Sequence, residues 1–368
     1  MDERIPLSIP AAAAALLLSF GGACSAAPSA PEPDTWHELA ALPYTWIRQM
    51  SFVSAQVGFA AGGNGQVLRT TDGGITWTPV VNAPYPYYWN GVHAVTPNDI
   101  VAAGFFNSDA AFAAMIRWSH DGGDTWSDDL VLSNAKYVSP MQVHFWNSQL
   151  GFVTTFAGAP SLFRTTSGGL GLTDWAAIAV NNDWFGPEIS VLPNGHVRMS
   201  GIQYCESTDS AASWSCRPSI DDAMPDYATF FVDDQHGWVG GGGDQGELQG
   251  EPPNFIGFVH VTNDGGATWS GRTLEMSWPI RSIVFVNKRD GWAMGGYAIE
   301  PVLPNAGGAY VSHDGGLTWA MEADLGSPPQ NCATADYHLF CATWDSVGTS
   351  HVFERDFDHI RVAEFEAE

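Results

Sequence analysis

The stretch Arg69–Trp77 reads RTTDGGITW, and close copies of it recur along the chain. Four copies are regular: TTDGGITW at 70–77, SHDGGDTW at 119–126, TNDGGATW at 262–269 and SHDGGLTW at 312–319. Two are degenerate, because TTSGGLGLTDW at 165–175 replaces the aspartate with serine and carries an insertion, and STDSAASW at 207–214 lacks both glycines. The copies predict one structural unit that is repeated along the chain.

Each copy has the composition of a β-hairpin turn. Asp and Ser/Thr side chains accept hydrogen bonds from N–H groups of a turn, and glycine adopts backbone angles that a Cβ atom disfavours. We expect the repeated aspartates to be structural, because a catalytic acid does not need a copy in every repeat. They are Asp72, Asp121, Asp209, Asp264 and Asp314.

The spacing of the copies predicts the fold. The tryptophans that end them recur at intervals of roughly fifty residues, which is typical of one four-stranded propeller blade per repeat. A polar turn followed by a short apolar strand occurs seven times, from SAQVGFAAG at Ser54 to ADYHLFCAT at Ala335. We therefore predict an all-β fold, a seven-bladed β-propeller of four-stranded antiparallel blades over residues 34–357. In the first repeat the strands a to d begin near Ile47, Gly58, Gln66 and Thr76.

The last repeat has no hairpin tryptophan and therefore lacks an outer strand of its own. DTWHEL (34–39) has the character of an outer strand with nothing before it, so it can close the seventh blade. The competing closure uses HIRVAEFEAE, which begins at His359 and also alternates. We favour the N-terminal strand, which makes residues 358–368 a C-terminal tail; in the alternative they are the closing strand.

The N-terminus resembles an export signal. The apolar run IPAAAAALLLSF (9–20) is too short to span a membrane comfortably, and residues 1–24 are predicted to be a signal peptide. GGAC, ending at Cys24, resembles a bacterial lipobox, although Gly21 and the start MDER depart from it. Residues 25–33 have the composition of a flexible tether. We expect a location in the bacterial cell envelope or outside the cell, with membrane contact only through a lipid on Cys24.

Charge and cysteines agree with export. The net charge is −26, which repels phosphate backbones, so no nucleic-acid partner is expected. Besides Cys24 there are two close cysteine pairs, Cys205–Cys216 and Cys332–Cys341. An oxidising compartment favours a disulfide in each pair, and neither has the spacing of a zinc site.

These motifs resemble known families. The units resemble the Asp-box (BNR) repeat of sialidases and related β-propellers. The fuller pattern GFAAGGNGQVLRTTDGGITW (58–77) is similar to the photosystem II stability/assembly factor family and its bacterial relatives. The resemblance runs from Asp34 to about Arg355, while the sialidases are more distant. It implies a propeller whose Asp-boxes lie away from the functional face, and a role in the assembly of a membrane complex. That family has an arginine-rich patch, whereas this chain is poor in arginine.

One face of the predicted propeller is a candidate binding surface. The loops from strand d to the next strand a share this face with the b–c loops and are rich in aromatic residues. Aromatic side chains beside arginines suit a protein segment or a glycan. We predict a monomeric, non-enzymatic scaffold that binds a protein partner in or near the envelope. The predicted partner-binding residues are Trp46, Arg48, Tyr85, Tyr87, Tyr88, Trp89, Trp184, Trp278 and Arg281.

The alternative is a secreted glycan-active protein, either a sialidase-like glycoside hydrolase or a lectin. A sialidase-like enzyme needs an arginine trio and a Tyr–Glu pair. The motif RIP at Arg4 lies in the export segment, and no pair of carboxylates stands out. No catalytic residue is therefore predicted.

No cofactor is predicted either. The long loop at 240–254 contains three acids that could hold a structural calcium ion, Asp244, Glu247 and Glu251. His93 and His144 fall at equivalent positions of neighbouring repeats, and we favour core histidines over a metal pair.

Overall fold

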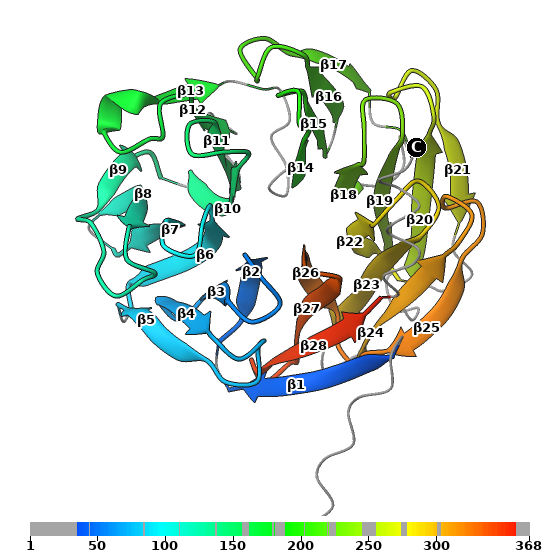
Figure 1. Ribbon diagram of the computed structural model, residues 1–368, viewed down its shortest axis with the longest axis horizontal. Helices are drawn as coiled ribbons and strands as arrows, with labels where there is room; N and C mark the ends of the chain where they lie inside the picture. The colour runs from blue at the N-terminus through cyan, green and yellow to red at the C-terminus, as the bar shows by residue number, and fades with distance from the viewer. Residues whose placement is uncertain are drawn as a thin grey trace, which may run out of the picture. The chain divides into compact units, whose positions relative to one another are not determined.

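The computed structural model describes residues 35–357, apart from 44, 84, 110, 137, 157–161, 179, 181–187, 202, 219, 221–225, 245–254, 274–277 and 300–302. The described residues belong to one compact unit of the chain, Pro33–Glu368. They form seven four-stranded antiparallel sheets arranged around a central channel, as the blades of a propeller (Figure 1). The predicted fold class is confirmed. Within the described part of the chain, no helix is long and apolar enough to cross a membrane.

The blades follow one another in chain order, and each begins with its innermost strand. Blade 1 contains β2 (Ile47–Phe52), β3 (Gly58–Gly62), β4 (Gln66–Thr70) and β5 (Thr78–Asn82). Blade 2 contains β6 (Tyr87–Ala94), β7 (Ile100–Asn107), β8 (Phe112–Ser119) and β9 (Leu130–Ser133). Blade 3 contains β10 (Ser139–Phe145), β11 (Gly151–Phe156), β12 (Leu162–Thr165) and β13 (Trp175–Ile178), with the 3-10 turn η1 (Leu172–Asp174). Blades 4 and 5 contain β14 (Glu188–Val191), β15 (Val197–Ser200), β16 (Gln203–Ser207) and β17 (Ser215–Pro218); and β18 (Asp226–Phe231), β19 (Gly237–Asp244), β20 (Phe255–Thr262) and β21 (Ser270–Thr273). Blades 6 and 7 contain β22 (Ile280–Phe285), β23 (Gly291–Ile299), β24 (Leu303–Ser312) and β25 (Ala320–Asp324); and β26 (Pro329–Ala335), β27 (His338–Trp344), β28 (Ser350–Asp356) and β1 (Trp36–Leu42).

Strands from both ends of the chain build blade 7. β1 lies antiparallel to β28 along its outer edge, in a register from Trp36↔Arg355 to Leu42↔Ser350 (Figure 1). The N-terminal strand therefore closes the ring, as the sequence favours. Without β1, β28 would be an unpaired sheet edge.

A polar network joins the closing blade to blade 6. Glu322 on β25 accepts hydrogen bonds from the indole N–H groups of Trp36 and Trp292 at 2.8 and 2.9 Å. It also pairs with the Arg355 guanidinium at 2.6 and 2.9 Å. Arg355 is buried, so losing its ion pair with Glu322 would be costly.

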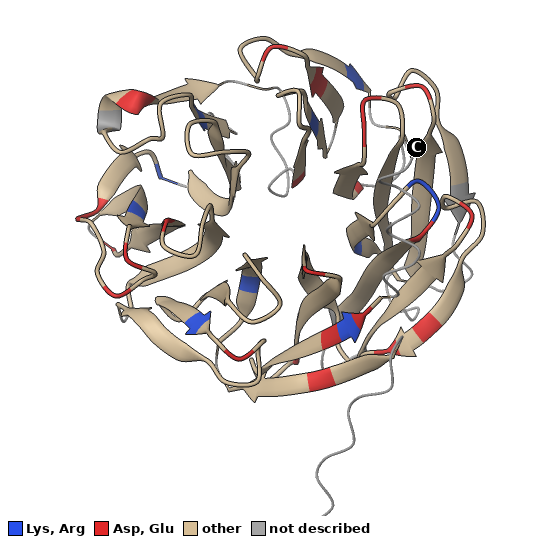
Figure 2. Ribbon diagram, viewed as in Figure 1, with Lys and Arg blue, Asp and Glu red and all other residues tan. Residues whose placement is uncertain are grey.

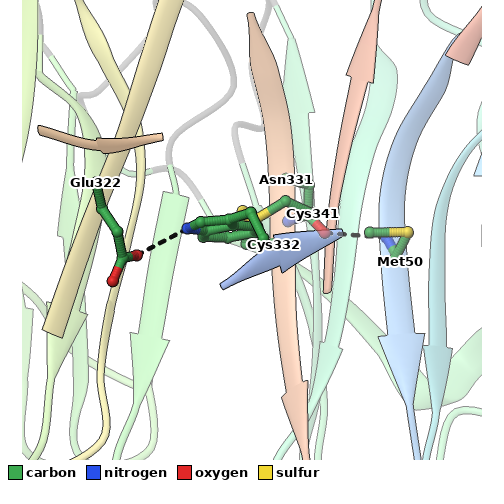
Figure 3. The surroundings of a disulfide bond; sticks show 6 residues. Met50, Glu322, Asn331, Cys332 and Cys341 are labelled. Carbon is green, nitrogen blue, oxygen red and sulfur yellow. Dashed lines mark hydrogen bonds between the residues drawn. A yellow bond between two sulfur atoms is a disulfide. The ribbon is translucent and has the colours of Figure 1, made fainter. Parts of the chain in front are cut away.

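The two predicted disulfides are present. Cys205 pairs with Cys216 across β16 and β17, where the Asp-box copy is degenerate. Cys332 pairs with Cys341 across β26 and β27 of the closing blade. In Figure 3 this disulfide lies between Glu322 and Asn331, whose side-chain oxygen accepts the Met50 N–H at 2.9 Å. Disulfides of this kind are typical of an oxidising compartment.

The apolar core is divided among the junctions between blades. Seven clusters of buried apolar side chains lie in the described residues, one at each junction. The tryptophan of each Asp-box copy packs on the preceding blade. Trp126 of blade 2, for example, joins the cluster around Phe59 and Val81 of blade 1, and Trp175 of blade 3 joins Trp118 of blade 2. The repeat therefore supplies both a turn and the apolar contact to its neighbour.

Candidate functional site at the channel mouth

The end of the channel formed by the d–a and b–c loops, the channel mouth, is ringed by a repeated β-bulge. In six of the described blades the pairing of the first two strands skips one residue of the innermost strand. A bulged residue is left out of the ladder, and its side chain can be aimed at a site. The bulged residues are Arg48, Asn90, Met141, Tyr227, Arg281 and Gln330.

Arg48 and Arg281 bring two positive charges to this ring. Arg48 is exposed, yet desolvation by the protein around it and the charge of Arg281 lower its pKa. Burial also lowers the pKa of Arg281, whose guanidinium lies 5.2 Å from the centre of the Tyr227 ring. Among the described residues neither arginine has a carboxylate partner, and the buried Nε of Arg281 has no hydrogen-bond partner. An unpaired buried donor is costly, so the Nε–H of Arg281 is a polar group left unsatisfied within the described residues.

A pocket of about 340 Å³ opens beside Arg48, between the mouth ends of blades 1, 2 and 3. Four aromatic residues line it, Trp46, Tyr88, Phe105 and Phe156, together with Met141. The Trp46 side chain is 41% exposed, and its backbone φ is +43°, a conformation that non-glycine residues rarely adopt. Strain of this kind persists where the surrounding structure holds it, often at functional sites.

Of the three predicted tyrosines, Tyr88 lines this pocket. Tyr88 stacks on Phe105 with ring centres 4.9 Å apart, and Tyr85 meets Tyr88 edge-on at 6.3 Å. Tyr85 is 74% exposed, while Tyr87 is half-buried and packs on Phe106. The structure thus brings Trp46, Arg48, Tyr85 and Tyr88 into one region of the mouth, with Tyr87 at its margin.

The prediction that Trp89 binds a partner is wrong. The sequence analysis places it on a binding loop, but β6 begins at Tyr87 and Trp89 pairs with Gly104 in the sheet. Because the bulge falls on the following residue, Asn90, the Trp89 ring turns into the core between blades 1 and 2 and is 0% exposed. It cannot contact a partner in this arrangement.

The remaining predicted residues divide. Trp278 is half-buried and lies against Gly308 of its own blade, outside the pocket beside Arg48. Trp184, Cys24, Glu247 and Glu251 lie outside the described residues, as does the side chain of Asp244. The calcium hypothesis therefore stays a prediction.

Below the mouth, the channel wall contains polar side chains that join neighbouring blades. Gln49 Oε1 accepts the N–H groups of Val92 and Val143 at 3.1 and 3.0 Å. Asn331 occupies the same position in blade 7, and Glu188 does so in blade 4, where its carboxyl group accepts the Thr229 N–H at 3.2 Å. Burial raises the pKa of Glu188 to about 8. A raised carboxyl pKa is often catalytic, but here the protonated acid takes the place of an amide in a repeated structural contact.

The two channel histidines behave as structural residues. The rings of His93 and His144 are 6.4 Å apart between their centres, and burial lowers their pKa values to about 4 and 3. His144 Nε2 lies 3.2 Å from Gln142 Oε1. Both rings are therefore neutral near pH 7 and held within the channel wall.

The opposite face, the Asp-box face, has a different chemistry. Asp72 accepts the Thr76 N–H and hydroxyl at 2.9 and 2.6 Å, and Thr70 Oγ1 accepts the Gly74 N–H at 2.8 Å. The same contacts recur around Asp121, Asp209, Asp264 and Asp314. These hydrogen bonds lower the pKa of Asp121 to about 2. Each of these carboxylates thus accepts hydrogen bonds within its own turn.

Even the degenerate copy in blade 4 keeps this geometry. Ser210 and Ala211 replace the two glycines and adopt φ values of +57° and +63°, while Gly73 and Gly74 in blade 1 have +75° and +93°. The conformation disfavours a Cβ atom, yet the Asp209 contacts are retained. The adjoining Cys205–Cys216 disulfide links the two strands that this strained turn connects.

Comparisons with known proteins agree with the fold. A model of the BNR/Asp-box repeat matches residues 310–321. A solved structure described as YCF48 bound to D1 peptide is 19% identical, covers 89% of this chain and 98% of its own, and has a TM-score of 0.62. YCF48 from Cyanidioschyzon merolae is 18% identical over 88% of this chain and 99% of its own, with a TM-score of 0.60. A chain of a Mitotic Checkpoint Complex is 11% identical over 94% of this chain and 99% of its own, with a TM-score of 0.62.

At these identities the solved structures establish a shared fold and nothing more. A search of curated protein sequences finds no match. The chain is thus similar to Asp-box propellers, including YCF48.

Proposed function

We propose that this propeller is an exported, non-enzymatic scaffold that binds a segment of a protein partner at the channel mouth. The observation that carries the proposal is the pair Arg48 and Arg281, two guanidinium groups near each other that have no carboxylate partner among the described residues. The chain carries 40 acidic residues against 14 Lys or Arg residues, and the acidic residues are spread over the blades in Figure 2. Leaving these two unpaired favours an acidic group of a ligand.

The aromatic pocket beside Arg48 supports a peptide as that ligand. Its volume of about 340 Å³ fits one or two side chains, and Trp46 offers an exposed ring at its rim. Aromatic and arginine side chains supply a large share of the energy in protein interfaces. The structural neighbour described as YCF48 bound to D1 peptide provides a precedent for peptide binding by a related fold. The two disulfides support export, and the envelope is the proposed location.

A binding assay with a matched control tests the proposal. An array of acidic, neutral and basic peptides is probed with the wild type, Arg48→Ala and Arg69→Ala. Arg69 also belongs to blade 1, but it bonds Gly122 O and Asp124 on the Asp-box side, so its removal changes the net charge equally. We expect the wild type and Arg69→Ala to retain acidic peptides, and Arg48→Ala to lose at least tenfold in affinity.

The opposite outcomes are informative. Equal retention by Arg48→Ala would contradict a binding role for the mouth. Retention of glycans but no peptides on a parallel glycan array would support the glycan-active alternative.

A further inference from the structure

Three side chains with metal-binding atoms converge on the outer half of blade 7, away from the channel mouth. His338 lies on β27, and Glu354 and Asp356 lie on β28. The strand register pairs His338 with Asp356 and Phe340 with Glu354, so all four side chains emerge on one face of the blade. Phe340 belongs to the cluster shared with blade 1, which places the group beside that junction.

Both carboxylates approach the same imidazole nitrogen. His338 Nδ1 is 2.5 Å from Glu354 Oε1 and 2.5 Å from Asp356 Oδ1. The three potential ligand atoms all lie within 4.8 Å of one another. The three residues are partly buried, so the group is shielded but remains accessible to a small ion.

Protons alone do not satisfy this arrangement. A single Nδ1 carries at most one proton, and the hydrogen bond that it makes goes to Glu354. Asp356 Oδ1 is buried and has no hydrogen-bond partner among the described residues, although it lies as close to the same nitrogen. The one proton on His338 Nδ1 therefore cannot serve both carboxylates.

We propose that His338, Glu354 and Asp356 bind a divalent transition-metal ion, with Zn²⁺ as the best match. Zn²⁺ accepts imidazole nitrogen and carboxylate oxygen at about 2.0–2.2 Å, whereas Mg²⁺ and Ca²⁺ prefer oxygen ligands alone. Tetrahedral ligands at that distance lie about 3.3 Å apart, so His338 Nδ1 must move away from each carboxylate oxygen by under about 1 Å. The net charge of −26 attracts a cation to the molecule in general.

The position of the site connects it to ring closure. His37 of β1 pairs with Glu354 of β28 in the sheet register, directly beside the proposed site. Glu354 thus lies between its partner strand β27 and the N-terminal strand. An ion held by β27 and β28 would fix the edge on which β1 docks.

Another histidine provides the matched control. His120 Nδ1 lies 2.8 Å from Asp99 Oδ1 on the Asp-box face, and this contact pairs one imidazole with one carboxylate. Such a pair needs no metal ion. If surface histidines in general bound zinc, His120→Ala and His338→Ala would have the same effect.

Isothermal titration with ZnCl₂ tests the site on the full chain. Every sample carries Cys24→Ser, which removes the one cysteine outside the two disulfides. We expect the Cys24→Ser protein to bind one Zn²⁺ per chain at this site. His338→Ala and Glu354→Gln should bind Zn²⁺ at least tenfold more weakly, and His120→Ala should bind it as tightly as the Cys24→Ser protein does. Circular dichroism monitors folding, and Glu354→Gln keeps the size of the side chain in case His338→Ala does not fold.

Three results would overturn the proposal. They are the absence of saturable zinc binding, undiminished binding by the folded Glu354→Gln variant, and Ca²⁺ binding as tight as that of Zn²⁺.

Discussion

The two faces of the propeller satisfy their polar groups in opposite ways. On the Asp-box face each carboxylate accepts hydrogen bonds from its own turn, as Asp72 does from Thr76. At the channel mouth six of the described blades carry a bulge on the innermost strand, and the bulged residue is an arginine in two of them. There Arg48 and Arg281 lack carboxylate partners among the described residues.

This difference separates the features that make the fold from those that suit a ligand. A contact repeated in every blade contributes to stability wherever it occurs, because it solves the same packing problem each time. A residue that departs from the repeat has no such role to explain it. Unsatisfied polar groups at the departing positions cost stability and are typical of binding sites. The predictions below compare the two faces by their effects on folding and binding.

The largest expected effect is on the Asp-box side of the molecule. Trp175→Ala removes a buried ring from the junction of blades 2 and 3 and the N–H that donates to Gly169 O at 2.8 Å. We expect a loss of about 3–5 kcal/mol in the free energy of unfolding. Chemical denaturation measures it, and the folded variant should still bind peptide at the channel mouth. A loss below about 1 kcal/mol would show that the hairpin tryptophans do not hold the blades together.

The next effect concerns the channel between the faces. The pKa of Glu188 is about 8 in the folded chain and near 4.5 unfolded, so the folded state holds its proton between those values. The stability it contributes is complete below pH 4.5 and is lost as the pH rises to 8, by about 1–3 kcal/mol after allowance for solvent.

Glu188→Gln should remove this loss of stability with rising pH, because the amide keeps an acceptor oxygen and has no proton to lose. His93 and His144 have lowered pKa values and act in the opposite direction, but only below about pH 6.5. Denaturation midpoints between pH 6.5 and 8 isolate the Glu188 effect. Parallel pH profiles for wild type and Glu188→Gln would contradict the raised pKa.

The part of this architecture that the sequence predicts is the part held by local chemistry. The Asp-box turn needs its aspartate, its hydroxyl and its glycines within eight residues, so Thr70–Trp77 is recognisable without any distant contact. The blade count and the closing strand follow from repetition, because the strands assigned in one repeat can be assigned at the equivalent positions of the others. The disulfides follow from their position across hairpins.

The channel mouth was predicted only in part, since its geometry depends on the bulges. A bulge shifts the facing of the residues before it by one position, and no local motif at Asn90 announces it. That shift places Trp89 in the core. The sequence does indicate Arg48 and Arg281, because each lies eleven residues before an aromatic residue of the next strand, Phe59 or Trp292. Their proximity to each other comes from the closed ring. The His338 group joins two strands of the last blade and has no sequence motif.

The third prediction is a substitution that does not lower stability, in contrast to most substitutions. Arg281→Ala removes a guanidinium whose buried Nε lacks a hydrogen-bond partner among the described residues and whose positive charge repels that of Arg48. We expect stability to stay the same or to rise by about 1 kcal/mol, while affinity for acidic peptides falls at least tenfold. Denaturation and peptide titration on the same sample measure both. A stability loss above about 1 kcal/mol would mean that Arg281 is a structural residue like those of the Asp-box face.

The smallest effect tests the Asp-box carboxylates themselves. Hydrogen bonds from the hydroxyl and N–H of Thr125, at 2.6 and 2.8 Å, lower the pKa of Asp121 to about 2, below the usual value of 3.8. A lowered pKa contributes stability that is complete above pH 3.8 and is lost as the pH falls through 2. Asp121→Asn keeps one acceptor oxygen but loses the charge, and the site is exposed, so its melting temperature should fall by less than in Trp175→Ala. The difference between wild type and Asp121→Asn should be constant from pH 5 to 7 and should shrink as the pH falls from 3.8 to 2. A difference that stays constant down to pH 2 would show that the carboxylate charge contributes nothing to the turn. Unchanged peptide binding by Asp121→Asn at pH 7 would then keep this face assigned to folding alone.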